Sequence, residues 1–62
     1  MNMILKELRI KAVLSQRDLS KLSGVAGSTI LYLEQNKCKP RFVTIRKLAK
    51  ALRVKPSEIE WL

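Results

Sequence analysis

Apolar residues recur at intervals of three and four along much of this chain, which is the spacing of helices that bury one face. The clearest stretch contains Ile45, Leu48, Ala49 and Leu52. We expect it to form a helix with Thr44 as its N-cap, because a threonine hydroxyl can accept a bond from a free amide of the first turn.

The same period predicts three earlier helices, over about residues 2–12, 16–23 and 26–35. Their predicted inward-facing residues are Leu5, Leu8, Ala12, Leu19, Leu22, Ile30 and Leu33. Pro56 suits the first position of a last short helix, which carries Ile59 and Trp61.

The ends of the middle helices carry recognisable signals. Ser15 followed by Asp18 is a short form of the capping box, and Gly24 is the residue expected where a helix ends in the left-handed conformation. Val25 should fix the turn against the core. Asn36 tolerates left-handed geometry and should end the third helix. A helix, a tight turn and a second helix are therefore predicted between residues 16 and 35.

The segment from Lys37 to Val43 is predicted to be a basic loop that contains Pro40. Phe42 and Val43 are expected to attach this loop to the core. Val54 is expected to pack in the core as well. No strand pattern or repeat is evident. We predict a single all-α domain over residues 1–62.

The chain is strongly basic, with 13 Lys and Arg against 5 Asp and Glu and a formal net charge of +8. Between Asn36 and Ser57 every charged residue is basic. Solubility alone usually mixes charges of both signs. The excess favours a polyanionic partner, most often nucleic acid and less often an anionic membrane surface.

Composition argues against several other classes. The single cysteine, Cys38, allows no intrachain disulfide, and a chain without histidine has few ligands for a metal. No apolar run approaches the length of a membrane span, and no catalytic constellation is visible. We expect a cytoplasmic protein with no cofactor, no small-molecule ligand and no enzymatic activity, in which Cys38 is an ordinary thiol.

The run LSQRDLSKLSGV, followed by STI, LEQNK, a proline and LAKALRV, closely resembles the Cro/C1-type helix-turn-helix family of phage and bacterial repressors. The resemblance extends from about Leu8 to Ile59. It implies a compact five-helix bundle like the lambda repressor DNA-binding domain, with the helix-turn-helix at the second and third helices. Members of the family bind operator DNA, usually as homodimers.

The resemblance also implies roles for particular residues. Arg9 and Glu34 match a salt bridge between the first and third helices, where chance surface charges are the alternative. The residues expected to contact the DNA backbone are Gln16, Arg17, Thr29, Lys37, Lys39 and Arg41. Those expected to face bases in the major groove are Ala26, Gly27, Ser28, Leu31 and Tyr32. The expected dimer contacts are Val54, Ile59, Trp61 and Leu62, although Trp61 could equally close the core of the monomer.

The third helix departs from the family, whose members often carry Gln, Arg, Asn or Lys at the base-facing positions. Three readings remain open. Ala26 or Leu31 contacts thymine methyls while Ser28 and Tyr32 form hydrogen bonds, or phosphate contacts dominate and DNA shape selects the sequence. In the third reading, Leu31 and Tyr32 bind a protein.

The sequence is best interpreted as a sequence-specific double-stranded DNA-binding regulator, a repressor that inserts its third helix into the major groove of a palindromic operator. Two other functions compete with it. One is an antitoxin-like protein-interaction module, and the other is an architectural factor that bends DNA during recombination.

Overall fold

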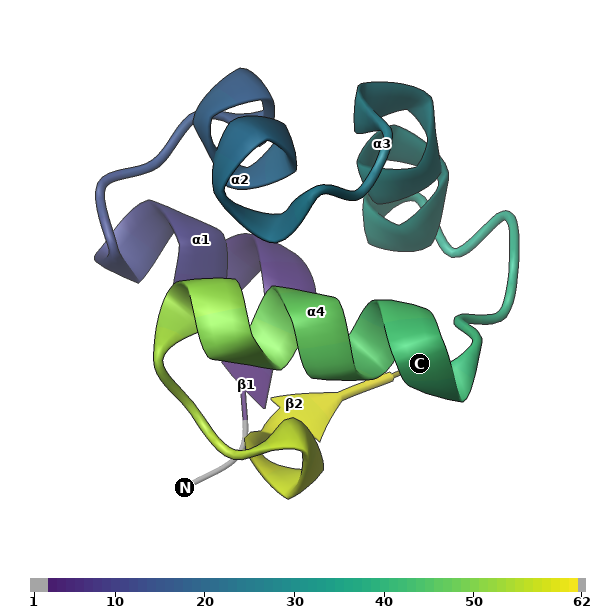
Figure 1. The fold of residues 1–62 in the computed structure, drawn as a ribbon. Coiled ribbons are helices and arrows are strands. Elements are labelled where there is room, and N and C mark those ends of the chain that lie inside the picture. The colour runs from purple at the N-terminus through teal and green to yellow at the C-terminus, as the bar shows by residue number, and fades with distance from the viewer. Residues whose placement is uncertain (1–2, 62) are drawn as a thin grey trace.

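The fold is a small helical bundle (Figure 1). Short segments near the start and the end of the chain pair as two parallel strands. The computed structural model describes residues 3–61. In chain order the elements are β1 (Met3–Ile4), α1 (Leu5–Lys11), α2 (Gln16–Ser23), α3 (Gly27–Glu34), α4 (Phe42–Leu52), a 3-10 turn (Pro56–Glu58) and β2 (Ile59–Glu60). None of the described helices is long and apolar enough to cross a bilayer.

The prediction of an all-helical bundle with five helices is wrong at both ends of the chain. Met3 pairs with Ile59 and Ile4 with Glu60, so the first helix begins at Leu5 and not at residue 2, which lies outside the described residues. The last predicted helix is one 3-10 turn, with Pro56 at its start. The described part of the chain therefore holds four α-helices. Strands of two residues carry no alternating pattern, so the sequence gives no sign of them.

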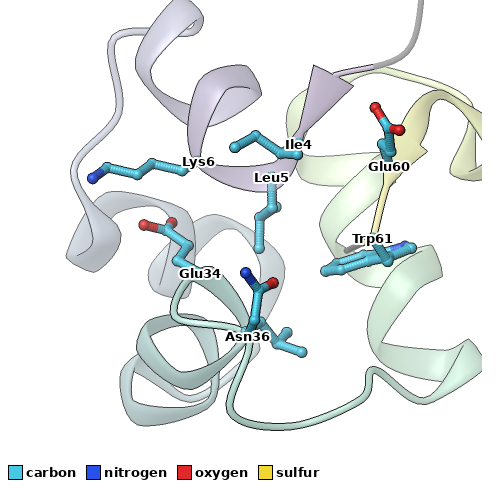
Figure 2. A pocket seen from close by; sticks show the side chains of 8 residues that line it. Ile4, Leu5, Lys6, Glu34, Asn36, Glu60 and Trp61 are labelled. Atoms are coloured by element: carbon cyan, nitrogen blue, oxygen red, sulfur yellow. The ribbon is translucent and has the colours of Figure 1, made fainter.

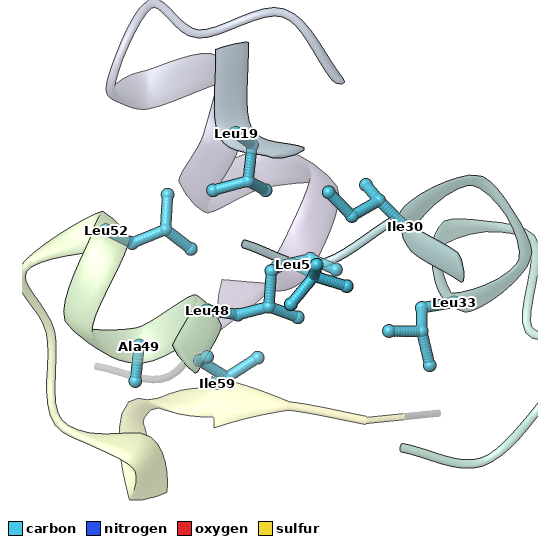
Figure 3. Packing of buried hydrophobic residues seen from close by; sticks show 9 residues of the cluster. Leu5, Leu19, Ile30, Leu33, Leu48, Ala49, Leu52 and Ile59 are labelled. Carbon is cyan, nitrogen blue, oxygen red and sulfur yellow. The ribbon is translucent and has the colours of Figure 1, made fainter. Parts of the chain in front are cut away.

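The core lies where the four α-helices and β2 meet, and Figure 3 shows its side chains converging from these elements. Leu19, Ile30 and Leu48 are completely enclosed. The whole buried set is Leu5, Leu19, Val25, Ile30, Leu33, Leu48, Ala49, Leu52 and Ile59. Leu8 and Val54 pack against it and are partly buried. The predicted stripe on α4 is confirmed, with Ile45 half-buried at its edge.

Leu22 and Ala12, which were predicted to be inward-facing residues of the first two helices, lie on the surface instead. Leu22 is 62% exposed. The Ser20 hydroxyl donates to the Val25 carbonyl at 2.6 Å, and the Ser23 hydroxyl accepts from the Val25 amide at 3.1 Å. These bonds hold the side of α2 that carries Ser20 and Ser23 against the segment that follows the helix. Leu22 lies on another side of α2 and faces solvent. Ala12 is exposed because it lies just beyond the last residue of α1.

The start of α4 also differs from the prediction. The helix begins at Phe42 with Arg41 as its N-cap, so Thr44 lies inside the first turn and is not the cap. The stripe from Ile45 to Leu52 determines which side of α4 faces the core. Phe42 and Val43 precede that stripe, and Phe42 is 82% exposed. The prediction that they attach the loop to the core is wrong.

The predicted helix ends in the middle of the chain are confirmed. The Ser15 hydroxyl accepts from the Asp18 amide at 3.0 Å, and the Asp18 carboxylate accepts from the Ser15 amide at 3.1 Å. These bonds hold the pKa of Asp18 below its usual value. Gly24 and Asn36 have positive φ angles of 75° and 58°, as the predicted left-handed ends require.

Two further left-handed residues, Val13 and Arg53, were not predicted, and Val13 suggests a stability test. Val13 has a φ of 58° and is 87% exposed. A β-branched side chain is strained in this region and here makes little contact in return. We expect Val13→Gly to raise the free energy of unfolding by about 0.5–1 kcal/mol, and Tm by about 2–8 °C. Thermal unfolding followed by circular dichroism measures the change.

Gly24→Ala is the matched control with the opposite expected sign. A Cβ at Gly24 meets no described atom within 4 Å, so its effect comes from the positive φ alone. We expect a loss of about 1 kcal/mol. A lower Tm for Val13→Gly would show that the Val13 side chain contributes more than its backbone conformation costs.

Candidate nucleic-acid interface

The helices α2 and α3 are joined by a tight turn of Gly24, Val25 and Ala26. Gly24 reverses the chain in the left-handed conformation, and Val25 is buried in the core. The Ser20 and Ser23 hydroxyls both bond to the backbone of Val25. The turn therefore fixes the two helices in one relative orientation. Each predicted feature of this turn is present.

A polar network ties the start of α2 and the body of α1 to the end of α3. Nε of Arg9 donates to Oε2 of Glu34 at 2.7 Å, and Nη2 donates to Oε1 at 3.1 Å. Nε2 of Gln16 donates to the same Oε1 at 3.1 Å, and Nη1 of Arg9 donates to the Leu14 carbonyl at 2.8 Å. The ion pair expected from the family resemblance is thus formed, and Gln16 joins it.

This ion pair is largely removed from water. The side chains of Arg9 and Glu34 are 12% and 4% exposed. The hydrogen bonding that Arg9 donates to Glu34 raises the pKa of Arg9 above its usual value. A bidentate ion pair of this kind fixes the relative orientation of the two side chains as well as the distance between them. It therefore holds α3 in place against α1 and α2.

The outer side of α3 carries the residues predicted to face bases. Ala26, Gly27 and Ser28 are exposed at the start of the helix, while Leu31 and Tyr32 are exposed further along. We call these five residues the reading face. Tyr32 is 47% exposed, and its phenol can both donate and accept hydrogen bonds. Ile30 and Leu33 anchor the opposite side of α3 in the core.

The predicted backbone-contacting cations lie in the connection between α3 and α4. We call Lys37, Lys39 and Arg41 the basic loop, and all three are exposed. An open groove of about 390 Å³ separates part of this loop from α3. It is lined by Thr29, Leu33, Cys38, Lys39, Pro40, Arg41 and Thr44. Thr29 of α3 and two of the loop cations thus share one concave surface.

The remaining predicted residues occupy other places. Arg17 is exposed in the first turn of α2, and Gln16 is half-buried against Glu34. Cys38 is a free, exposed thiol. Within residues 3–61, no group of His, Cys, Asp and Glu side chains is arranged to hold a metal ion.

The sequence reasoning missed the start of α4 as part of this surface. Arg41 makes no side-chain capping bond, so the first amides of α4 have no side-chain acceptor. They lie directly after the basic loop, where the positive end of the helix dipole suits an anion. The sequence carries no signal for this start, because the N-cap is Arg41 and not one of the residues preferred at that position.

A family model for helix-turn-helix proteins matches residues 5–59, which include α2, the turn, α3 and the basic loop. The chain belongs to the helix-turn-helix family. It is therefore a DNA-binding protein that regulates transcription, in line with the sequence interpretation. In this helix-turn-helix protein, α2 and α3 are the two helices of the helix-turn-helix motif.

A solved structure supports the same family. The protein is similar to the restriction-modification controller protein C.AhdI from Aeromonas hydrophila, with 41% sequence identity and a TM-score of 0.84. The match covers 87% of this chain and 82% of that chain. A comparison with curated proteins found no match.

The predicted dimer residues of this helix-turn-helix protein lie near its C-terminal end, and the dimer stays a prediction. Ile59 is only 4% exposed in the single chain, and Val54 and Trp61 pack partly buried against the core. Leu62 lies outside the described residues. Figure 2 shows Trp61 beside a small hollow that it shares with Leu5. At about 20 Å³ this hollow holds no more than a water molecule.

Proposed function

We propose that this helix-turn-helix protein is a sequence-specific repressor that inserts α3 into the major groove of a palindromic operator as a homodimer. The observation that carries the proposal is the shared groove of Thr29, Lys39 and Arg41. Two cations that would hold phosphates lie in it beside the helix that would enter the DNA. We expect this activity in the cytoplasm.

Each part of the surface has a proposed role. The basic loop, the first amides of α4, Arg17 and Thr29 would hold phosphates. Gln16 would contact the DNA backbone while its amide holds Glu34, so one residue links the backbone contact to the position of α3. The reading face would select the sequence through thymine methyls and through the hydroxyls of Ser28 and Tyr32.

The exposure of Ser28 and Tyr32 favours this direct reading over recognition of DNA shape alone. Leu31 and Tyr32 together also form a surface that a protein could bind. That feature favours the antitoxin-like alternative. DNA-binding measurements separate the two functions.

The likeness to a restriction-modification controller protein suggests a class of target. We propose that the operator lies in front of the genes of a restriction-modification system and that binding controls their transcription. A reporter gene behind such a promoter tests the direction. Reporter output should fall when the protein is present, and a rise would identify an activator.

Binding to a palindromic operator should exceed binding to random DNA by at least about a thousandfold. If four to six phosphates are neutralised per subunit, log affinity should fall with log salt with a slope of about −4 to −5 for each subunit. Mobility-shift measurements with competitor DNA test both values. Equal affinity for both DNAs would favour an architectural factor, and no binding at low salt would leave the protein-interaction function.

The roles of α3 and the loop can be separated by substitution. Ser28→Ala or Tyr32→Phe should relax sequence preference, because each removes a hydroxyl that can bond to base edges. Lys39→Ala should weaken binding to operator and random DNA alike. Binding to an operator set with single base-pair changes measures the preference. If Lys39→Ala changed the preference and the α3 variants did not, this division of roles would be wrong.

A further inference from the structure

A second groove lies between the end of α2 and the C-terminal half of α4. It is open, has a volume of about 440 Å³, and is lined by Leu22, Ser23, Lys47, Lys50, Ala51 and Arg53. Figure 1 shows α2 above this half of α4, while α3 lies above the other end of the helix. We call this surface the α2–α4 groove.

The α2–α4 groove combines one large apolar side chain with three positively charged ones. Leu22 is 62% exposed, and the two serine bonds to Val25 keep its side of α2 turned outwards. Lys47, Lys50 and Arg53 are exposed around it, and no acidic residue lines the groove. None of these three cations forms an ion pair within residues 3–61. A groove that combines an apolar anchor with charge of one sign suits a partner with the complementary arrangement.

This surface is separate from the candidate DNA interface. The α2–α4 groove contains no residue of α3 or of the basic loop. The groove beside α3 reaches α4 at Thr44, whereas the α2–α4 groove reaches it from Lys47 onwards and includes Ala51. Thr44 and Lys47, the nearest residues of the two grooves on α4, lie about 4.5 Å apart along the helix axis. The two grooves therefore meet α4 on successive turns and share no lining residue.

We propose that the α2–α4 groove binds an acidic amphipathic segment of a partner protein. An apolar side chain of the segment would cover Leu22, and its carboxylates would pair with Lys47, Lys50 and Arg53. Charge complementarity argues for an acidic partner. DNA fits less well, because the groups of its backbone that would pair with the cations are phosphates, which carry no apolar surface to cover a leucine. The inference adds a protein-binding surface to the proposed DNA-binding function.

The test uses the whole chain and a synthetic peptide in the absence of DNA. The probe is a labelled 15-residue helical peptide with leucines at i, i+3 and i+7 and glutamates on either side of them. Fluorescence anisotropy gives its Kd, and amide chemical shifts of ¹⁵N-labelled protein locate its site. We expect saturable binding and shifts centred on Leu22, Ser23 and Ala51.

Two variants test the two parts of the groove. Leu22→Ser should weaken peptide binding about tenfold, because it removes the apolar anchor. The Lys47→Glu/Lys50→Glu double variant should weaken it by more than tenfold, because the charges would then repel. Each has a control on α1 with the same chemical change at exposed positions: Ile10→Ser for the leucine, and Lys6→Glu/Lys11→Glu for the lysines. Both controls should change Kd less than threefold.

A second peptide separates specific docking from general attraction between opposite charges. It has the same composition, with its leucines distributed around the helix, and it should bind at least tenfold more weakly. Equal affinity for the two peptides, or equal losses in the α1 controls, would overturn the proposal. The proposal would also be overturned if operator DNA shifted the amides of the α2–α4 groove and competed with the peptide. The peptide affinities and the peptide-induced shifts are measured without DNA, so failure of the proposed DNA function would leave this part of the test intact.

Discussion

Glu34→Ala is expected to lower the free energy of unfolding by about 3 kcal/mol, because it leaves the largely buried charge of Arg9 without its ionic partner. The Glu34 carboxylate accepts two bonds from Arg9 and one from Gln16, and only 4% of its side chain is exposed. Small domains often have total stabilities of only about 5 kcal/mol. A decrease in Tm of at least about 10 °C should follow.

Urea unfolding followed by circular dichroism measures this loss of stability. Three further variants show whether the Arg9–Glu34 pair causes it. Glu7→Ala removes an exposed carboxylate from α1 and should cost only a few tenths of a kcal/mol. Glu34→Gln keeps most of the shape of the side chain, and its loss of stability should lie between those of Glu34→Ala and Glu7→Ala. Combining Arg9→Met with Glu34→Leu should recover much of the loss, since apolar replacement of a buried pair is often neutral. A loss for Glu34→Ala no larger than that for Glu7→Ala would show that the pair contributes little.

Replacing Lys37, Lys39 and Arg41 together by alanine should lower operator affinity about a hundredfold for each subunit at physiological salt. Three lost phosphate contacts also reduce the slope of log affinity against log salt by about 2.7 for each subunit. All three side chains are exposed, so the fold should tolerate the change. Mobility shifts at several salt concentrations give both quantities.

The matched control for the basic loop is Lys6→Ala/Lys11→Ala/Lys55→Ala, which removes the same charge from exposed positions elsewhere. It should weaken binding less than tenfold and leave the salt slope almost unchanged. If both triple variants lost affinity equally, net charge and not the position of the basic loop would drive binding. Circular dichroism of both variants verifies that they remain folded.

Features that depend on near neighbours in the chain were predictable from the sequence. The capping bonds between Ser15 and Asp18 span three residues, and Gly24 and Asn36 satisfy backbone geometry at their own positions. The bounds of α2 and the core-facing sides of α3 and α4 follow from the helical period. The Arg9–Glu34 pair required more than a local pattern, because 25 residues separate its members, and it was expected only from the family resemblance.

The sequence by itself determined the helix-turn-helix, the charge and most of the core, because these depend on local geometry and periodicity. Tertiary structure decided the joining of Met3–Ile4 to Ile59–Glu60, since backbone hydrogen bonds between distant segments leave no mark on side-chain pattern. It also decided that Leu22 and Phe42 are exposed. A helical period shows which residues share a face, but only the packing of neighbouring elements determines how far along the helix that face is covered.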